Sequence, residues 1–146
     1  MEKVKVQNFK NHARLVPPFH FFVLPVLLIN LIYALVRLKD GITFPSVWSA
    51  VMALALLMAV VLLRVMTLTV QDRVIRLEMQ MRLERLLAAE LRPRIGEFTL
   101  DQLIGLRFAG DDELPVLARQ VLDEKLTSRK LIKQRVKDWR PDFLRA

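Results

Sequence analysis

Two long stretches without any charged side chain constrain this chain more than any other feature of its sequence. Residues 19–36 and residues 41–63 contain no Asp, Glu, Lys or Arg. An α-helix rises about 1.5 Å per residue, so each stretch is long enough to cross a hydrocarbon layer of about 30 Å. The rest of the chain is strongly charged, and the formal net charge of the 146 residues is +8. The sequence therefore predicts a membrane part, residues 19–63, joined to a basic soluble part.

The first stretch is the less regular of the two, because it contains His20, Pro25 and Asn30. A secretory signal peptide is the alternative interpretation, since it would also be apolar and close to the N-terminus. The stretch starts late for a signal peptide, and the polar link after it shows no small-residue cleavage pattern. We therefore favour a membrane span.

The distribution of positive charge predicts how the two spans are oriented. Lys and Arg near the ends of spans prefer the cytoplasmic side of the membrane. Most of the basic residues follow residue 63, and residues 1–18 are also basic. We expect a helical hairpin with both termini in the cytoplasm, and residues 1–18 lying on the inner membrane surface, where anionic head groups attract Lys and Arg. A disordered basic tail is the alternative for this segment.

The second span is predicted to continue into solvent as one helix. No Gly or Pro interrupts the chain between Pro45 and Pro93, and residues 64–93 keep an apolar face at helical spacing. We expect this helical stalk to end at Arg92 and Pro93. The row that we call the stalk stripe consists of Val70, Val74, Leu77 and Met81, and the residues that widen it are Ile75, Met79, Leu83 and Leu86. Acid-first pairs four residues apart, which favour a helix, are Asp72 with Arg76 and Glu78 with Arg82.

Residues 94–146 predict a small domain of short helices. Thr99 with Gln102 forms a capping-box pattern, Gly110 is placed as a helix stop, and Asp111 or Asp112 is expected to cap the next helix. A third helix is expected from Ser128. Its apolar residues are Leu131, Ile132, Val136 and Trp139, and those of the second helix are Leu114, Leu117, Ala118, Val121, Leu122 and Leu126. No alternating strand pattern is present, so the predicted fold class is all-α: a membrane hairpin, a long helix and a small helical bundle.

Charge is separated along this domain. Acidic residues dominate residues 95–127, and basic residues dominate residues 128–146. We favour a structural interpretation, in which the last helix packs against the acidic ones. The functional alternative is a basic tip for nucleic acid, lipid or an acidic partner, and its residues would be Arg129, Lys130, Lys133 and Lys137. Nucleic acid is the less favoured ligand, because apolar residues interleave at core spacing.

The residue types that catalysis and metal binding require are sparse. There is no Cys, the only histidines are His12 and His20, and the four Gly are isolated. The two histidines could ligate haem or a metal, but an anchoring role at the interface is favoured. Asn30 and Tyr33 would share one face of the first span, where we expect interhelical hydrogen bonds more than a substrate contact. We predict no catalytic residue, no cofactor and no metal.

Several segments together resemble a known family. They are "QNFKNHARLVPPFH", "TVQDRVIRLEMQMRL", "LIGLRFAGDDELPVLA" and "LIKQRVKDWRPD". The combination resembles a bacterial family of small two-span membrane proteins that is described only as a domain of unknown function. The resemblance implies the same topology and a location in the bacterial inner membrane. It implies no catalytic residue.

Three functional hypotheses follow. The first is a non-enzymatic, membrane-anchored scaffold or accessory subunit, acting as a homo-oligomer or within a larger membrane complex, with the stalk stripe as its contact surface. The second is a small oligomeric transport or channel component, with Asn30, Tyr33 and His20 lining a path between protomers. A membrane-tethered binder of anionic lipid or nucleic acid is a minor alternative.

Overall fold

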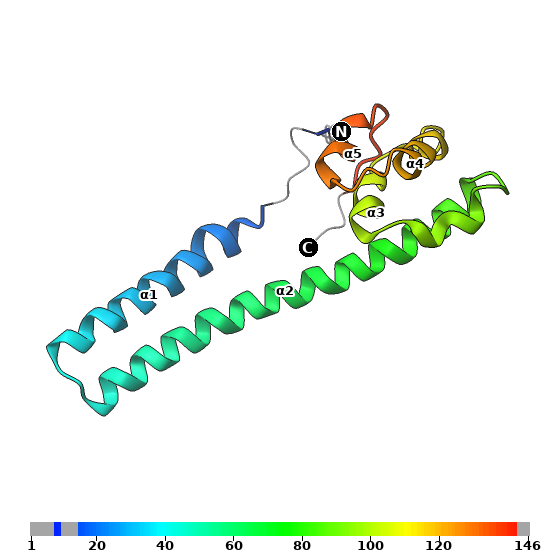
Figure 1. The fold of residues 1–146 in the computed structure, drawn as a ribbon. Helices are drawn as coiled ribbons and strands as arrows, with labels where there is room; N and C mark the ends of the chain where they lie inside the picture. The colour runs from blue at the N-terminus through cyan, green and yellow to red at the C-terminus, as the bar shows by residue number, and fades with distance from the viewer. Residues whose placement is uncertain (1–7, 10–14, 143–146) are drawn as a thin grey trace. The chain divides into compact units, whose positions relative to one another are not determined.

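The computed structural model describes residues 8–9 and 15–142, and within these ranges it contains helices and a single isolated β-bridge (Figure 1). The described residues fall into two compact units: residues 15–69 form one, and residues 70–142 form the other together with residues 8–9. We call them the apolar unit and the C-terminal unit. The predicted all-α class is confirmed for the described residues. The segment predicted to lie on the membrane surface, residues 1–18, is largely outside the described residues.

The apolar unit begins with a π-helical turn, Phe19–Val23, which leads into α1, Leu24–Arg37, and a 3-10 turn, Leu38–Asp40. Pro25, which has no backbone N–H to donate, is the second residue of α1 and directly follows the π-helical turn. The first part of α2, Phe44–Leu86, completes the unit. The two helical stretches Phe19–Asp40 and Phe44–Leu86 are long and apolar enough to cross a membrane, and only 6% of the apolar window in each is buried.

The link between α1 and α2 is a tight turn. Gly41 adopts a φ of 151°, a conformation that other residues rarely adopt. Thr43 and Ser46 then bond reciprocally at the start of α2: the Thr43 N–H donates to Ser46 Oγ at 2.9 Å, and the Ser46 N–H donates to Thr43 Oγ1 at 3.4 Å. These bonds satisfy N–H groups that have no partner inside the helix, so the sequence itself fixes where α2 begins.

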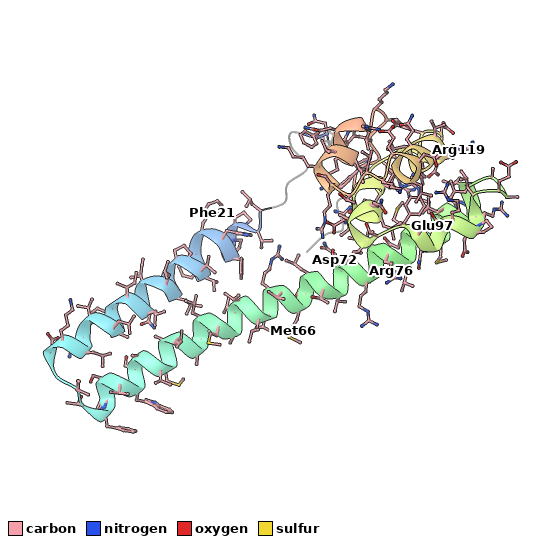
Figure 2. The ribbon with its side chains drawn as sticks, viewed as in Figure 1. Phe21, Met66, Asp72, Arg76, Glu97 and Arg119 are labelled. Carbon is pink, nitrogen blue, oxygen red and sulfur yellow. The ribbon has the colours of Figure 1, made fainter. Side chains whose placement is uncertain are left out.

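The C-terminal unit combines the end of α2 with a 3-10 helix, Arg92–Glu97, and with α3, Leu100–Leu106, α4, Leu114–Asp123, and α5, Arg129–Arg135. Figure 2 shows the change along α2: carbon and sulfur dominate the side chains of the apolar unit, and nitrogen and oxygen tips become frequent from Asp72 onward. The unit has one continuous core. Its most deeply buried large side chains are Leu83, Leu87, Leu103, Leu106, Phe108, Leu114, Val121 and Ile132.

The end of α2 differs from the prediction. The helix ends at Leu86, before the expected stop at Arg92 and Pro93. Leu87 and Leu91 turn into the core, and Arg92 donates from Nε to the Leu87 carbonyl at 3.0 Å. This bond satisfies a carbonyl left over at the helix end, and Pro93 is the second residue of the following 3-10 helix. Burial of two leucines therefore ends the helix earlier than its local sequence indicates.

The helix starts predicted from local capping are confirmed in two places out of three. The Thr99 and Gln102 capping box is formed at α3, and the Ser128 side chain accepts from the Leu131 N–H at α5. The expected Asp cap of α4 is wrong: Glu113 occupies the N-cap position without a side-chain bond, and Asp111 is taken by Arg82.

Gly110 also has a different role from the expected helix stop, because α3 already ends at Leu106. The chain beyond α3 runs beside the segment beyond α5. The Gly110 N–H donates to the Asp138 carbonyl and the Arg140 N–H donates to the Phe108 carbonyl, both at 2.8 Å. A Cβ at Gly110 would collide with the Asp138 side chain. The Asp138 side chain therefore occupies the space that a Cβ at position 110 would need.

The docking of α5 onto α3 depends on a second close approach. A Cβ built on Gly105 would lie 2.8 Å from Cγ2 of Ile132, which is fully buried. The other apolar residues predicted for this region behave unequally: Val136 is buried and Trp139 is partly buried. Leu131, another of the apolar residues expected on this helix, is 50% exposed. Because α5 ends at Arg135, Trp139 reaches the core from the extended segment instead.

Candidate functional site

The part of α2 in the C-terminal unit has two apolar faces. Ile75, Met79 and Leu83 are buried in the core, with exposed fractions of 6%, 2% and 0%. The stalk stripe lies on the other side of the helix, since residues advance by about 100° each around an α-helix. Its exposed fractions are 62% for Val70, 47% for Val74, 61% for Leu77 and 72% for Met81. The single wide stripe of the sequence thus separates into a core face and an opposite, open face.

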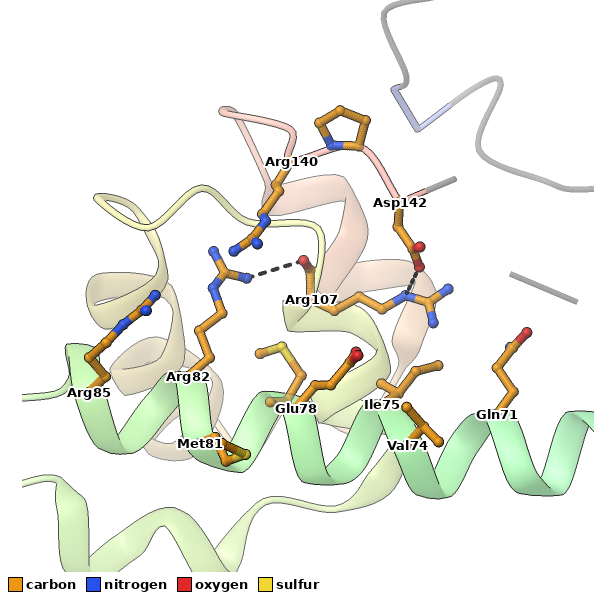
Figure 3. A pocket seen from close by; sticks show the side chains of 12 residues that line it. Gln71, Val74, Ile75, Glu78, Met81, Arg82, Arg85, Arg107, Arg140 and Asp142 are labelled. Carbon is orange, nitrogen blue, oxygen red and sulfur yellow. Dashed lines mark hydrogen bonds and ion pairs between the residues drawn. The ribbon is translucent and has the colours of Figure 1, made fainter. Parts of the chain in front are cut away.

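A groove of about 740 Å³ borders the stripe in the C-terminal unit (Figure 3). Val74, Glu78 and Met81 line it from α2, and Arg107 and the segment after α5 line it from the other side. Its complete lining is Gln71, Val74, Ile75, Glu78, Met79, Met81, Arg82, Arg85, Arg107, Arg140, Pro141 and Asp142. Two stripe residues therefore reach into a groove with basic walls.

Arg82 is the central polar residue of the unit, and it is 9% exposed. Its Nε donates to Asp111 Oδ1 at 2.7 Å, and its terminal nitrogens donate to the carbonyls of Arg107 at 3.2 Å and Ala109 at 2.6 Å. These carbonyls belong to the segment that follows α3. Burial lowers the pKa of Arg82, and the hydrogen bond to Asp111 opposes that effect. The predicted pairing of Arg82 with Glu78 is wrong, because the guanidinium turns to Asp111 instead.

Asp111 accepts from more than one arginine. Arg85 lies 3.6 Å from Asp111 Oδ2, and Arg140 lies 3.4 Å from Asp111 Oδ1. The hydrogen bond from Arg82, followed by the charges of these arginines, lowers the pKa of the Asp111 carboxyl. One carboxylate therefore joins α2 to the segments that follow α3 and α5.

The wall of the groove opposite α2 contains Arg107, which packs on aromatic residues. Arg107 forms an ion pair with Asp142, with 3.5 Å between Nε and Oδ2, and its guanidinium lies 4.6 Å from the centre of the Phe108 ring (Figure 3). The Phe108 ring centroid is 4.9 Å from that of Trp139. Cation–π and aromatic contacts of this kind hold the planar groups in fixed positions. The basic wall is thus part of the folded core.

Two of the four side chains of the predicted basic tip, those of Arg129 and Lys133, make contacts within the unit. Arg129 pairs with Asp101 at 2.6 Å, and Lys133 lies 5.0 Å from the Phe108 ring centre. The backbone N–H of Lys137 donates to Glu113, whereas Lys130 is exposed. Next to them Arg135 pairs with Glu124 at 2.7 Å, and the hydrogen bond from Arg135 lowers the pKa of Glu124. These contacts fit the structural interpretation of the separated charge.

The polar residues predicted in the first span belong to the apolar unit. Asn30 is exposed, and Tyr33, 61% exposed, accepts a 3.4 Å hydrogen bond from Arg37. His20 lies against the backbone of Val16, 2.9 Å from its carbonyl, and His12 is outside the described residues. Among residues 8–9 and 15–142, no group of three or more His, Cys, Asp or Glu side chains could hold a metal ion.

The comparison with family models decides what the chain belongs to. A family of unknown function, DUF6526, matches residues 1–146. The chain is a member of DUF6526. The match covers the whole chain, so the apolar unit, α2 and the C-terminal unit are all parts of the DUF6526 domain. No curated protein and no solved structure matches it.

Sequence reasoning missed the Arg82 and Asp111 centre of this DUF6526 domain. A signal was present: Arg82 follows Ile75 and Met79 at seven and three residues and precedes Leu86 by four, which is core spacing. A charged residue at a core position needs a partner, because an unpaired buried charge is costly. That partner lies beyond α3, and helical spacing alone does not reveal it.

Proposed function

We propose that this protein is a non-enzymatic, membrane-anchored scaffold or accessory subunit that presents the stalk stripe to another helix in the cytoplasm. The observation that carries the proposal is the exposure of the stripe on a helix whose opposite face is already buried. The core of the C-terminal unit buries Ile75, Met79 and Leu83. It leaves the stalk stripe exposed.

The exposed row is consistent with a contact surface on physical grounds. Burial of one large apolar side chain contributes about 1.5–3 kcal/mol, so a helix that covered the stripe would be stabilised by several such contributions. Contiguous exposed apolar residues on a charged unit mark interaction sites more often than isolated ones do. The stripe is rigidly placed, because the other side of α2 is fixed in the core.

The anchor in this proposal is a two-span helical hairpin. The two helices that are long and apolar enough to cross a membrane support it, as does their low burial. The positive charge on residues 1–18 and after residue 63 favours an orientation with both termini in the cytoplasm. With the resemblance noted for the sequence, we infer the bacterial inner membrane as the location.

The engagement of the charged side chains favours a scaffold over an enzyme. Arg82, Asp111 and Arg107 hold segments of the C-terminal unit together. Arg129 and Arg135 of α5 pair with acids of the same unit. These charged side chains hold the C-terminal unit together on the side of α2 opposite the stalk stripe. We assign them no chemical step.

The test is the mass of the assembly in mild detergent. Leu77→Lys with Met81→Lys places two charges on the stripe, and we expect the complex to dissociate. Val116→Lys with Leu131→Lys is the matched control, because these residues are also apolar and are 62% and 50% exposed. The control should retain the assembly of the wild type. An unchanged mass and unchanged co-purifying chains for the stripe variant would contradict the proposal.

A further inference from the structure

We propose that the partner of the stalk stripe is the same stripe of a second copy of this chain, in a parallel, in-register, two-stranded coiled coil bordered by ion pairs between Arg73 and Glu78 of the second copy. The inference rests on the proposed membrane anchor, which gives both copies the same orientation. A second copy of the chain is thus the partner that binds the stalk stripe, and the two helices lie parallel.

The spacing of the stripe is that of a heptad seam. Steps of four, three and four residues separate Val70, Val74, Leu77 and Met81. In a heptad lettered a to g, these steps place Val70 and Leu77 at d and Val74 and Met81 at a. Such a seam keeps facing a neighbouring helix when two helices supercoil. A β-branched residue at a, such as Val74, with leucine at d, such as Leu77, favours two strands over three or four.

The chain's own core covers the side of α2 that a coiled coil does not use. Ile75 and Arg82 fall at b, Leu83 at c and Met79 at f, and all four are buried in the C-terminal unit. Positions b, c and f point away from the partner in a two-stranded coiled coil. The core of the C-terminal unit therefore packs against positions b, c and f and leaves the side chains at a and d exposed.

The charges beside the seam fit a second copy in parallel orientation. Arg73 falls at g and Glu78 at the following e, and both side chains are exposed. In a parallel pair, g of one helix faces the next e of the other, so each Arg73 faces a Glu78 across the seam, twice by symmetry. Neither side chain takes part in an ion pair within residues 8–9 and 15–142. The next g and e are Gln80 and Arg85, which do not repel each other.

The groove beside the stripe gives the second helix room on the e edge. Glu78 and Arg85 line the groove together with Val74 and Met81 (Figure 3). The g side chains of the second copy would enter this space. The seam is short, and anchoring both copies in one membrane raises their effective concentration, which allows a short seam to hold the pair.

Cysteine cross-linking of the full chain in native membranes tests the geometry. The chain contains no Cys, so Leu77→Cys introduces a unique thiol at d. The two thiols of a parallel pair should lie close enough for a disulfide, which requires Cβ atoms about 3.5–4.5 Å apart. We expect a disulfide dimer under mild oxidation. The control is the neighbouring exposed residue, Arg76→Cys at position c, which should remain monomeric.

Charge reversal in the Leu77→Cys background tests the ion pairs. Arg73→Glu or Glu78→Arg alone places like charges across the seam and should reduce the disulfide dimer by roughly three- to tenfold. Arg73→Glu with Glu78→Arg restores opposite charges and should restore cross-linking. Equal cross-linking at positions 77 and 76, or no recovery in the double reversal, would overturn the inference.

The outcome also separates this inference from the proposed function. If Leu77→Cys gives no homodimer while the lysine substitutions in the stripe still release another chain, the scaffold remains and the second copy is wrong. If the homodimer forms and both charge reversals behave as described, both stand.

Discussion

Arg82 and Asp111 are 29 positions apart in the sequence, yet Arg82 Nη2 lies 2.6 Å from Asp111 Oδ1. The Arg82 side chain is 9% exposed, and the Asp111 side chain is 46% exposed. The same arginine reaches two carbonyls beyond the end of α3. This contact joins the helix that carries the stripe to the rest of the C-terminal unit. It therefore holds α2, which carries the stalk stripe, in a fixed position within the C-terminal unit.

Removal of the Asp111 charge should destabilise the C-terminal unit. Asp111→Asn takes the ionic partner from a buried guanidinium, and we expect a loss of about 2 kcal/mol in the free energy of unfolding. Thermal unfolding of the full chain in mild detergent measures this, with the fluorescence of Trp139 read in a Trp48→Phe background. Asp112→Asn is the control, since Asp112 is exposed and adjacent. Equal melting temperatures of the two variants would argue against the role of Asp111.

The difference in melting temperature between the wild type and Asp111→Asn should depend on pH in a defined direction. The pKa of Asp111 is lowered in the folded state, chiefly by the hydrogen bond from Arg82. The stabilisation is therefore complete above the ordinary pKa of an aspartate, about 3.9, and is lost as the pH falls through the lower folded pKa. The melting difference between wild type and Asp111→Asn should be constant above about pH 5 and shrink below about pH 4. A difference that stays constant down to pH 3 would contradict this account.

The packing of α5 on α3 should not tolerate a methyl group at Gly105. Alanine normally favours a helix over glycine by up to about 1 kcal/mol, but here its Cβ would meet Ile132 at 2.8 Å. We expect Gly105→Ala to lower the free energy of unfolding by about 1–3 kcal/mol. Gly96→Ala, where nothing lies within 4 Å, should have little effect.

A double variant tests whether Ile132 is the cause. Ile132→Ala creates a cavity and should be destabilising by itself, by about 2–5 kcal/mol. In combination with Gly105→Ala the two losses should be less than additive by roughly 1 kcal/mol, because the cavity accepts the new methyl group. Strict additivity in denaturant unfolding would show that another contact limits this site.

The parts of the fold that depend on neighbouring residues could be predicted, and those that depend on distant ones could not. The Thr99 capping box and the buried face of α4 follow from spacing within one or two turns, and both are formed. The end of α2 at Leu86 depends on where Leu87 and Leu91 find the core. Sequence periodicity does not contain that information.

The candidate site could likewise be predicted only where it depends on neighbouring residues. Periodicity identified the stalk stripe, but it also merged the stripe with Ile75, Met79 and Leu83, which face the opposite way. The two faces separate only because α3, α4 and α5 pack against one of them. Asp111 was expected at a helix cap for the same reason: its true partner, Arg82, lies in another helix.

The most direct test of the central claim is the accessibility of the stripe in native membranes. In inverted inner-membrane vesicles, Val74→Cys and Val116→Cys are labelled with a membrane-impermeant maleimide, and the rates are compared. Val74 and Val116 are 47% and 62% exposed in the single chain, so their rates should be similar if nothing covers the stripe. We predict that Val74→Cys reacts at least tenfold more slowly than Val116→Cys, and that adding Leu77→Lys and Met81→Lys restores its rate. Equal rates in the otherwise unchanged chain would contradict the claim that another helix covers the stalk stripe.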